Sequence, residues 1–170
     1  DFLEAFQERE EDDANYVNSL DWRKAEIPSA KGMRFGIVVA NWNGEITNNL
    51  LTGAKSTLLE CGASDKQITI IEVPGSFELV FGAKLLSKKK FDAIICLGSV
   101  IQGETKHFDF VCNAVSLGIK DLNIALGIPV IFGVLTDNTF EQAISRSGGK
   151  LGNKGIEAAI TAIKMAHLNK

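Results

Sequence analysis

The strongest constraint on the fold of this chain is a recurring pattern, in which short, mostly apolar runs alternate with longer segments of helical periodicity. The apolar runs lie at 34–40, 67–73, 91–99 and 129–135. The segments with apolar residues at helical spacing lie at 45–62, 77–90, 109–127, 139–145 and 155–168. Nearly continuous apolar runs, such as the one at 34–40, are typical of strands buried on both faces, and strands that alternate with helices form parallel βαβ units. The sequence therefore predicts an α/β fold, a three-layer α/β/α sandwich around a four-stranded parallel sheet.

Glycine and lysine residues mark where some of these helices are expected to end. Gly62 and Gly127 each follow a helical segment, and glycine readily takes the left-handed conformation that closes a helix. The lysines at 88–90 are expected in the last turn of the 77–90 helix, because positive charge suits the negative end of the helix dipole.

The first thirty residues differ from the rest of the chain. They are acidic and charged, lack a sustained period and end in a turn-like segment. We therefore predict an N-terminal arm over 1–30, partly disordered, and a single α/β domain over 31–170. Leu20, Trp22 and Ile27 are apolar residues within 16–28, and this part of the arm is expected to dock on a neighbouring molecule.

Composition excludes several classes of protein. A chain of 170 residues with 45% hydrophobic content suits one globular domain. The net charge of −3 gives no general attraction to nucleic acid or to an anionic membrane, and no apolar run reaches the roughly 18 residues of a membrane span. The first residues also lack the basic and apolar regions of a secretory signal. We expect a cytoplasmic protein that binds neither nucleic acid nor membrane.

Three cysteines, Cys61, Cys96 and Cys112, cannot all pair within the chain, and none has the CxxC spacing of a metal site. Cys96 lies inside an apolar run. We interpret all three as reduced, mostly buried thiols of an intracellular protein, with a catalytic thiol as the alternative.

Ligands of an open parallel sheet bind beyond the carboxyl ends of its strands, so the segments that follow the strands are the candidate site. These segments lie at 41–45, 74–78, 99–107 and 136–139, and all contain small or polar residues. The third contains Gly103, Glu104 and Thr105 just before a helix, where backbone N–H groups favour an anion. An ordinary strand-to-helix turn is the alternative.

Histidine is rare in this chain, which has only two. His107 follows the candidate anion site, where an imidazole can exchange protons near neutral pH. A capping or structural histidine is the alternative. His167 lies near the C-terminus and is expected to be solvated.

A basic, glycine-rich segment at 145–155 supplies positive charge to this acidic protein. Arg146 offers a planar fork that can bind phosphate through two hydrogen bonds, and Lys154 offers a mobile point charge. The segment has neither the P-loop nor the GxGxxG spacing, and a simple linker is the alternative.

Aromatic residues in the first two loops suggest a site for a planar ligand. Trp42 can stack on a heterocycle, with Asn43 available for polar contacts. Phe77 and Glu78 are candidates for an aromatic and acidic wall, and a core role for Phe77 is the alternative.

Four long motifs in register give the chain a family resemblance. VPGSFEL at 73–79, GSVIQGETKHFDFV at 98–111, PVIFGVLT at 129–136 and GKLGNKG at 149–155 resemble the lumazine synthase family over residues 34 to about 168. The resemblance implies a flavodoxin-like topology and a transferase of riboflavin biosynthesis. Its activity joins 5-amino-6-(D-ribitylamino)uracil to 3,4-dihydroxy-2-butanone 4-phosphate, gives 6,7-dimethyl-8-ribityllumazine with loss of phosphate and water, and uses no metal or organic cofactor.

The resemblance also implies roles for individual residues. Trp42 matches the aromatic that stacks on the uracil, Glu104 and Thr105 match the turn that binds the sugar phosphate, and His107 matches the proton-transfer residue. The segment that holds the ribityl chain is matched by Ser76, Phe77 and Glu78, and the strand end that pairs with the pyrimidine is matched by Ser99, Val100 and Ile101. Phe132 matches a pocket wall, Arg146 the phosphate-binding arginine and Lys154 a pocket lysine.

Family members assemble as pentamers, some as sixty-subunit icosahedral shells, with sites shared between adjacent subunits, and riboflavin synthase is a further partner. The resemblance therefore implies that Phe132, Arg146 and Lys154 meet Trp42 and His107 across an interface.

Departures from the family's motifs are few. The chain has Lys106 where many members have proline, TDNT at 136–139 for the commoner TTDT or TADT, and Gly149 for threonine or leucine.

The rival hypotheses are a non-catalytic flavin- or lumazine-binding protein, a structural shell protein on the same scaffold, and a flavodoxin-like electron carrier. The 41–45 segment disfavours the last, because it lacks the Ser/Thr/Gly-rich composition of an FMN loop.

Overall fold

The first strand, β1 (Phe35–Ala40), explains why the chain forms a sheet that is covered on both faces. All of its residues are buried in the computed structural model, which describes residues 26–170. Phe35, Ile37 and Val39 pack into one apolar core, whereas Val38 and Ala40 pack into another. Successive side chains of a strand point to opposite faces, so a continuous apolar run requires a cover on each side.

Four parallel strands form the central sheet in the order β2-β1-β3-β4, with Val38 level with Cys96 of β3 and Cys96 level with Phe132 of β4. The elements that follow β1 are α2 (Gly44–Glu60), β2 (Ile68–Val73), α3 (Leu79–Leu86), β3 (Ala93–Ile101), α4 (His107–Leu126), β4 (Val130–Asp137), α5 (Phe140–Arg146), β5 (Ser147–Gly149), β6 (Gly152–Asn153) and α6 (Lys154–Leu168). The α/β/α sandwich predicted from the sequence is confirmed.

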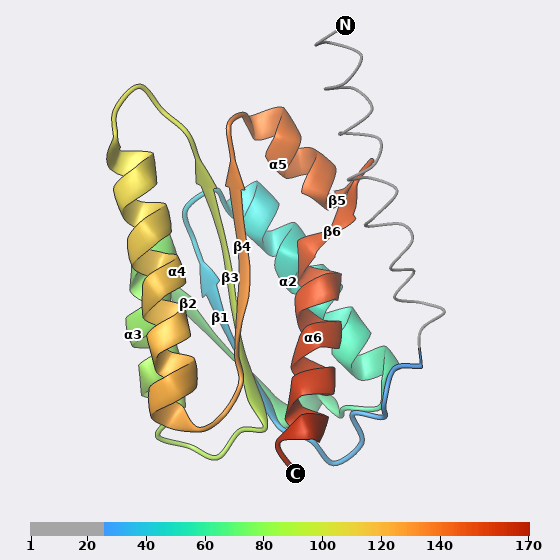
Figure 1. The fold of residues 1–170 in the computed structure, drawn as a ribbon. Helices are drawn as coiled ribbons and strands as arrows, with labels where there is room; N and C mark the ends of the chain where they lie inside the picture. The colour runs from blue at the N-terminus through green and yellow to red at the C-terminus, as the bar shows by residue number, and fades with distance from the viewer. Residues whose placement is uncertain (1–25) are drawn as a thin grey trace, which may run out of the picture.

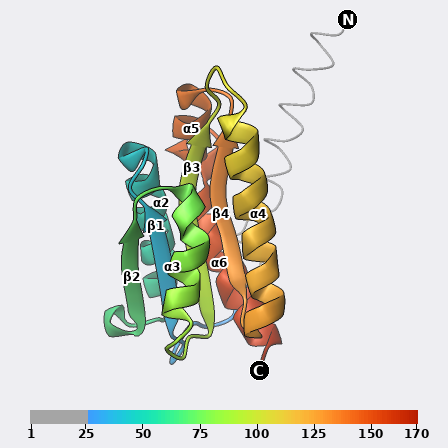
Figure 2. The ribbon, with the colours of Figure 1, turned by 90° about the vertical axis from the view of Figure 1, so that its left-hand side faces the viewer.

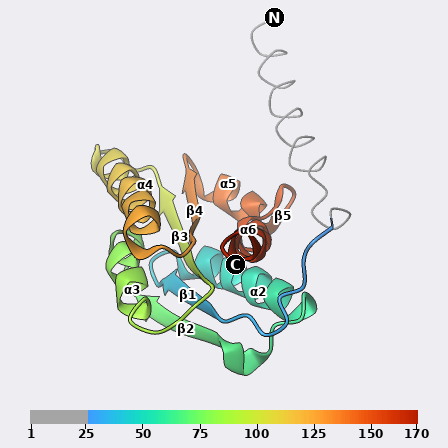
Figure 3. The same cartoon turned by 60° about the horizontal axis from the view of Figure 1, so that its bottom comes forward.

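The helices form two layers, one on each face of the sheet. Helices α3 and α4 lie side by side on one face, and α2, α5 and α6 lie on the other (Figures 1 and 2). Figure 3, in which the bottom of Figure 1 comes forward, separates the same three layers. The carboxyl ends of the strands, the start of α4 and helix α5 all lie at the top of Figure 1, so the candidate loops share one end of the molecule.

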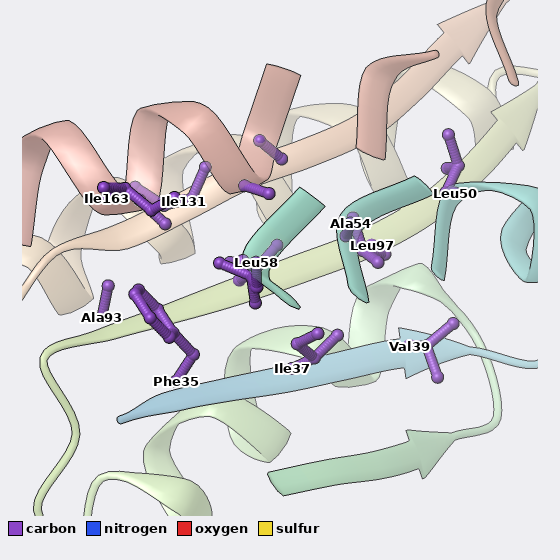
Figure 4. Close-up of a cluster of buried hydrophobic side chains, with 14 of the residues drawn as sticks. Phe35, Ile37, Val39, Leu50, Ala54, Leu58, Ala93, Leu97, Ile131 and Ile163 are labelled. Carbon is purple, nitrogen blue, oxygen red and sulfur yellow. The ribbon is translucent and has the colours of Figure 1, made fainter. Parts of the chain in front are cut away.

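One core fills the space between the sheet and the α2 and α6 layer. Figure 4 shows Leu50, Ala54 and Leu58 of α2 in the same buried cluster as Phe35 and Ile37 of β1. The α2 residues recur every four positions, so they lie along one face of the helix. Burial of this stripe against β1 fixes the start of α2, and with it the loop that follows β1.

Two predicted helix ends are confirmed, and the predicted end of the 77–90 helix is wrong. Gly62 (φ 111°) and Gly127 (φ 67°) adopt the positive φ expected just after α2 and α4. Helix α3 ends at Leu86, so the lysines at 88–90 lie beyond its last turn. Beyond Ser87 the N–H groups of Lys88 and Lys89 donate to carbonyls only three residues back, so the chain leaves the α-helix in a tighter turn.

The glycine-rich segment at 145–155 is more ordered than the linker alternative suggests. Its middle forms a small antiparallel hairpin of β5 and β6 between α5 and α6. Gly148 (φ 114°) and Gly152 (φ 86°) adopt left-handed conformations, which other residues rarely take. The hairpin therefore fixes the end of α5 relative to the start of α6.

The described chain begins at Glu26, so most of the predicted arm, including Leu20 and Trp22, lies outside the described residues. Ile27 packs against the protein's own core, and Ala30 is fully buried there. His167 is not simply solvated, because it is half-buried and its Nε2 lies 2.8 Å from the Ser29 carbonyl oxygen. From residue 26 onward, none of the helices has the length and apolar character that crossing a bilayer requires.

Candidate functional site

The loop after β1 is tied to the end of β3 by Asn43. Its Nδ2 donates a hydrogen bond to the Ser99 carbonyl oxygen at 3.0 Å. Asn43 has a φ of 58°, in the left-handed region that asparagine tolerates better than most residues. This turn leaves Trp42 at the edge of the sheet with 74% of its surface exposed. An indole in this position is available to stack on a planar ligand.

The same loop is tied to the segment after β2 by two backbone hydrogen bonds. The N–H of Asn41 donates to the Val73 carbonyl at 2.8 Å, and the N–H of Trp42 donates to the Pro74 carbonyl at 2.9 Å. The first two loops of the candidate site therefore lie together, next to the end of β3.

Two buried serine hydroxyls lie at this edge without a hydrogen-bond partner in the described part of the chain. They are Oγ of Ser76 and Oγ of Ser99. Ser76 fits there because Gly98 has no side chain, and a Cβ at that position would lie 2.5 Å from the Ser76 hydroxyl. A buried hydroxyl without a partner costs free energy, so each position favours an additional hydrogen-bonding group that the described chain does not supply.

The segment between β3 and α4 is exposed and ends in the candidate proton-transfer residue. Residues 103–107 are all exposed, and His107 is the first residue of α4. The His107 N–H donates to the Thr105 hydroxyl at 3.4 Å, a long contact. The first N–H groups of a helix have no partner within the helix, so this end suits an anion.

The end of β4 lies next to the loop after β3 and close to Arg146. Together with the loops after β1, β2 and β3 it forms the row of loops at the carboxyl ends of the strands. The Gln102 N–H donates to the Asp137 carbonyl at 2.9 Å, which ties the loop after β3 to β4. Nη1 of Arg146 donates to the Gln142 carbonyl at 3.3 Å and lies 3.7 Å from Asp137 Oδ1. Burial raises the pKa of the Asp137 carboxyl, and the Arg146 guanidinium acts in the opposite direction.

Asn153 positions Lys154 at the start of α6. Its side-chain oxygen accepts hydrogen bonds from the N–H groups of Gly155 (2.8 Å) and Ile156 (3.3 Å), so it caps the helix. Its Nδ2 donates to the Asn49 carbonyl of α2 at 3.1 Å. Lys154 is therefore fixed relative to α2, and its Nζ lies 4.0 Å from Glu157 Oε2.

The predicted site residues fall into two groups. The first lies on consecutive strand ends and the start of α4: Trp42, Asn43, Ser76, Phe77, Glu78, Ser99, Val100, Ile101, Gly103, Glu104, Thr105 and His107. Arg146 and Lys154 form the second group with Phe132. Within residues 26–170, neither cation hydrogen-bonds or ion-pairs with the first group. Phe77 is 62% exposed, so it lies outside the core of this chain.

Phe132 lies well away from the row of loops. It is level with Cys96, whereas the last residue of β4, Asp137, is level with Ile101. At about 3.3 Å per residue, Phe132 lies roughly 16 Å before the end of its own strand. Its side chain is 37% exposed, on a strand at the edge of the sheet.

The surroundings of the three cysteines disfavour the alternative of a catalytic thiol, and the prediction of mostly buried thiols holds fully for Cys96. Burial raises the pKa of the Cys96 thiol to about 12. Cys61 and Cys112 are half-buried, and burial together with the neighbouring carboxylates of Glu60 and Asp109 raises the pKa of each. A thiolate, the nucleophilic form, is therefore disfavoured at all three.

An open groove of about 420 Å³ lies between α2 and the β5–β6 hairpin. It is lined by Glu45, Asn49, Thr52, Gly53, Ile144, Ser147, Gly148, Gly149 and Asn153. None of these is a predicted site residue. Among residues 26–170, His, Cys, Asp and Glu form no cluster of three or more that could hold a metal ion.

With this geometry in view, comparison with known proteins decides the family. The sequence profile of 6,7-dimethyl-8-ribityllumazine synthase matches residues 32–170. This chain belongs to the lumazine synthase family. The match covers every element of the sheet and both helical layers, so the family resemblance seen in the motifs is confirmed.

Curated lumazine synthases from several bacteria are similar over nearly the whole chain. The protein of Cytophaga hutchinsonii is 59% identical over 148 residues, which is 86% of this chain and 93% of the relative. That of Christiangramia forsetii is 57% identical over 155 residues, covering 90% and 92%. That of Flavobacterium johnsoniae is 56% identical over 154 residues, covering 90% and 81%. All three bear the name 6,7-dimethyl-8-ribityllumazine synthase.

Sequence reasoning missed three residues that shape this lumazine synthase scaffold. Gln142 and Asp137 both contact Arg146, and Asn153 caps α6. Two of them had a readable signal. Thr139 and Gln142 form a capping box with the spacing T-x-x-Q, and Asn153 precedes a helix. Asp137 had none, because nothing local indicates that a strand-end aspartate meets an arginine nine positions later.

Proposed function

We propose that this protein condenses 5-amino-6-(D-ribitylamino)uracil with 3,4-dihydroxy-2-butanone 4-phosphate to give 6,7-dimethyl-8-ribityllumazine, phosphate and water. The observation that carries the proposal is the convergence of the loops after β1, β2 and β3 in a chain of the lumazine synthase family. The reaction requires an amine to attack a carbonyl, an imine to form, phosphate to leave and a ring to close. A site for it must hold a flat heterocycle against a phosphorylated ketone.

The uracil partner is assigned to the first two loops and the end of β3. Trp42 stacks on the ring, Asn43 supports the turn, and backbone groups of residues 99–101 pair with the pyrimidine edge. Ser76, Phe77 and Glu78 hold the ribityl chain. The unpartnered Ser76 hydroxyl supports this assignment, because a polyol can supply the hydrogen bond that the hydroxyl lacks.

The ketone partner is assigned to the two anion-binding features. Backbone N–H groups of residues 103–105 and the guanidinium of Arg146 bind its phosphate, and Lys154 adds a positive charge. The same contacts stabilise the charge that builds on phosphate as it leaves. His107, next to the phosphate, moves protons between the amine, the carbonyl oxygen and the ring.

Positioning is the larger part of the proposed catalysis. Holding two substrates in a reactive geometry contributes up to roughly 7–11 kcal/mol in well-oriented systems. Proton transfer by a positioned side chain contributes about 10²- to 10⁴-fold, which is at most about 5 kcal/mol.

We propose that each site is completed by a neighbouring copy of the chain. Phe132 lies roughly 16 Å before the strand end, and Arg146 and Lys154 make no hydrogen bond or ion pair with the first group in the described chain. If a second copy supplies these three residues, all predicted positions can meet at one site. Phe132 is exposed on the edge strand β4, as a residue that serves a neighbour must be.

A stripe of exposed apolar residues supports a homo-oligomer. On α4, Phe110, Leu117 and Ile124 are spaced seven residues apart and are 72%, 57% and 77% exposed. Phe81 and Leu85 of α3, which lies beside α4 in Figure 2, are also exposed. Large exposed apolar side chains gathered on two neighbouring helices favour a protein–protein interface. We propose a pentamer as the unit of assembly, alone or within a sixty-subunit icosahedral shell.

The remaining parts of the proposal concern context. We propose that residues 1–30 act as an arm and residues 31–170 as the catalytic domain, that the enzyme works in the cytoplasm, and that riboflavin synthase is a partner that uses its product. The burial of Ala30 supports a junction close to this boundary.

The direct test is to incubate the purified protein with both substrates and to follow the absorbance of the lumazine product. We expect turnover, and we expect Arg146→Ala to raise the KM for the butanone phosphate at least tenfold while the KM for the uracil changes little. Lumazine or flavin binding without turnover would contradict the proposal and favour a binding protein on the same scaffold. An unchanged KM in Arg146→Ala would remove this arginine from the phosphate site.

A further inference from the structure

Asp137 is a buried acid that the proposed reaction does not use. It ends β4 with only 6% of its surface exposed. Its Oδ2 atom has no hydrogen-bond partner within residues 26–170, and its Oδ1 atom lies 3.7 Å from Nη1 of Arg146. A buried carboxylate with one oxygen unpartnered lowers stability, so its position next to Arg146 calls for another explanation.

Arg146 is held on one side only. Nη1 is the nitrogen that donates to the Gln142 carbonyl at 3.3 Å and faces Asp137 at 3.7 Å. In the described part of the chain, Nε and Nη2 have no hydrogen-bond or ion-pair partner, and the side chain is 39% exposed. A guanidinium held in this way leaves the three N–H groups of Nε and Nη2 free, and this edge can donate to two oxygens of a phosphate.

The contact between Asp137 and Arg146 is loose. Charge-assisted hydrogen bonds between nitrogen and oxygen measure about 2.7–2.9 Å, so 3.7 Å describes an ion pair without a direct hydrogen bond. The guanidinium is therefore not locked to the acid, but it feels a negative charge that opposes any bound phosphate.

We propose that Asp137 acts through Arg146 by offsetting part of the guanidinium charge, so that inorganic phosphate is held weakly enough to leave after each turnover. This inference rests on the proposed role of Arg146 in binding phosphate. Substrate phosphate and product phosphate meet the same arginine, so an acid at this distance loosens both and speeds release of the product.

Asp137→Asn tests the charge while it keeps the shape of the side chain and an oxygen that can accept from Nη1. Two constants are measured, namely the inhibition constant of inorganic phosphate against the condensation and the KM of each substrate. We expect the inhibition constant and the KM for the butanone phosphate to fall about 1.5- to fivefold, the range of an ion pair with one partly exposed partner. The KM for the uracil should stay the same.

The direction of the change separates this role from structural damage, because a disordered site binds phosphate more weakly. An unchanged or raised inhibition constant overturns the proposal. Titration of the protein with inorganic phosphate in a calorimeter gives the same comparison without turnover. Asp65→Asn is the matched control, since it removes an equal charge from the Lys55–Asp65 ion pair (3.0 Å), which lies between α2 and the turn before β2. An equal gain in phosphate affinity in this control would assign the effect to net charge and overturn the proposal.

A double variant keeps this inference separate from the proposed function. If Asp137 acts through Arg146, then Asp137→Asn should have no further effect on phosphate in an Arg146→Ala background. An equal fall in the inhibition constant of inorganic phosphate in the Arg146→Ala background overturns the inference. If Arg146→Ala alone leaves the KM for the butanone phosphate unchanged, the proposed phosphate site is wrong. If Arg146→Ala raises that KM and Asp137→Asn leaves phosphate affinity unchanged, only the role of Asp137 is wrong.

Discussion

Gly155 lies where α6 begins against the backbone of α2, and replacing it with alanine is expected to weaken the fold strongly. A Cβ at this position would lie 2.7 Å from the carbonyl carbon of Leu50 and closer still to its oxygen. Ordinary contacts of this kind begin at 3.4 Å. The neighbouring atoms belong to the backbone, so no side chain can rotate away, and α6 must move from α2 by about 1 Å.

The cost can be estimated from overpacked cores. Such substitutions lower the free energy of unfolding by about 1–3 kcal/mol, and a clash with backbone belongs at the upper end. For a chain of this length, 3 kcal/mol corresponds to a fall in Tm of roughly 6–12 °C. The N–H of Gly155 also donates to the Asn153 cap at 2.8 Å, so the displacement weakens that hydrogen bond as well.

Thermal denaturation followed by circular dichroism measures this effect, with Gly44→Ala as the matched control. Gly44 begins α2, and a Cβ there would meet no atom within 4 Å. We expect this control to raise the free energy of unfolding by about 0.4–1 kcal/mol, because alanine restricts the unfolded chain. If Gly155→Ala unfolds at the same temperature as the unaltered protein, the close approach of α6 to α2 is not needed for stability.

Three further predictions concern the site and its supports. His107→Ala should lower kcat by about 10²- to 10⁴-fold with little change in the KM for the uracil, and full activity would dismiss the proton-transfer role. Asn153→Ala removes the two hydrogen bonds that cap α6 and should cost about 1–2 kcal/mol in urea denaturation, whereas an unchanged midpoint would mean that the cap is dispensable. Burial raises the pKa of Asp137, so the native protein keeps this proton to higher pH than the unfolded chain does. The free energy of unfolding therefore falls as pH rises above the ordinary pKa of an aspartate, and Asp137→Asn should remove this part of the fall, while identical pH profiles of the two proteins would refute it.

The sheet and its helices could be predicted because their signals are local. A continuous apolar run such as β1 has one good solution, a strand covered on both faces, and the stripe along α2 indicates the face that packs on it. The predicted end of α3 was wrong because a lysine run looks like a last helical turn, although the helix ends at Leu86, before the lysines.

The candidate site was predictable in its residues more than in its contacts. Trp42 and His107 follow strands, and the rule that ligands bind beyond strand ends located them at one edge. Asn43 and Ser99, which form a hydrogen bond, lie far apart in the sequence, and Arg146 and Asp137 belong to different elements. Such contacts depend on how the elements pack against one another, which the local sequence does not show.

The central claim is that one site is built from the strand-end loops of one copy and from Arg146 and Lys154 of the next. Mixing tests it most directly. His107→Ala and Arg146→Ala subunits, each inactive when alone at low concentrations of the butanone phosphate, are unfolded together and refolded in equal amounts. A shared site predicts that about a quarter of the interfaces combine an intact histidine with an intact arginine and that activity returns in proportion. A mixture no more active than its separate components would contradict the claim.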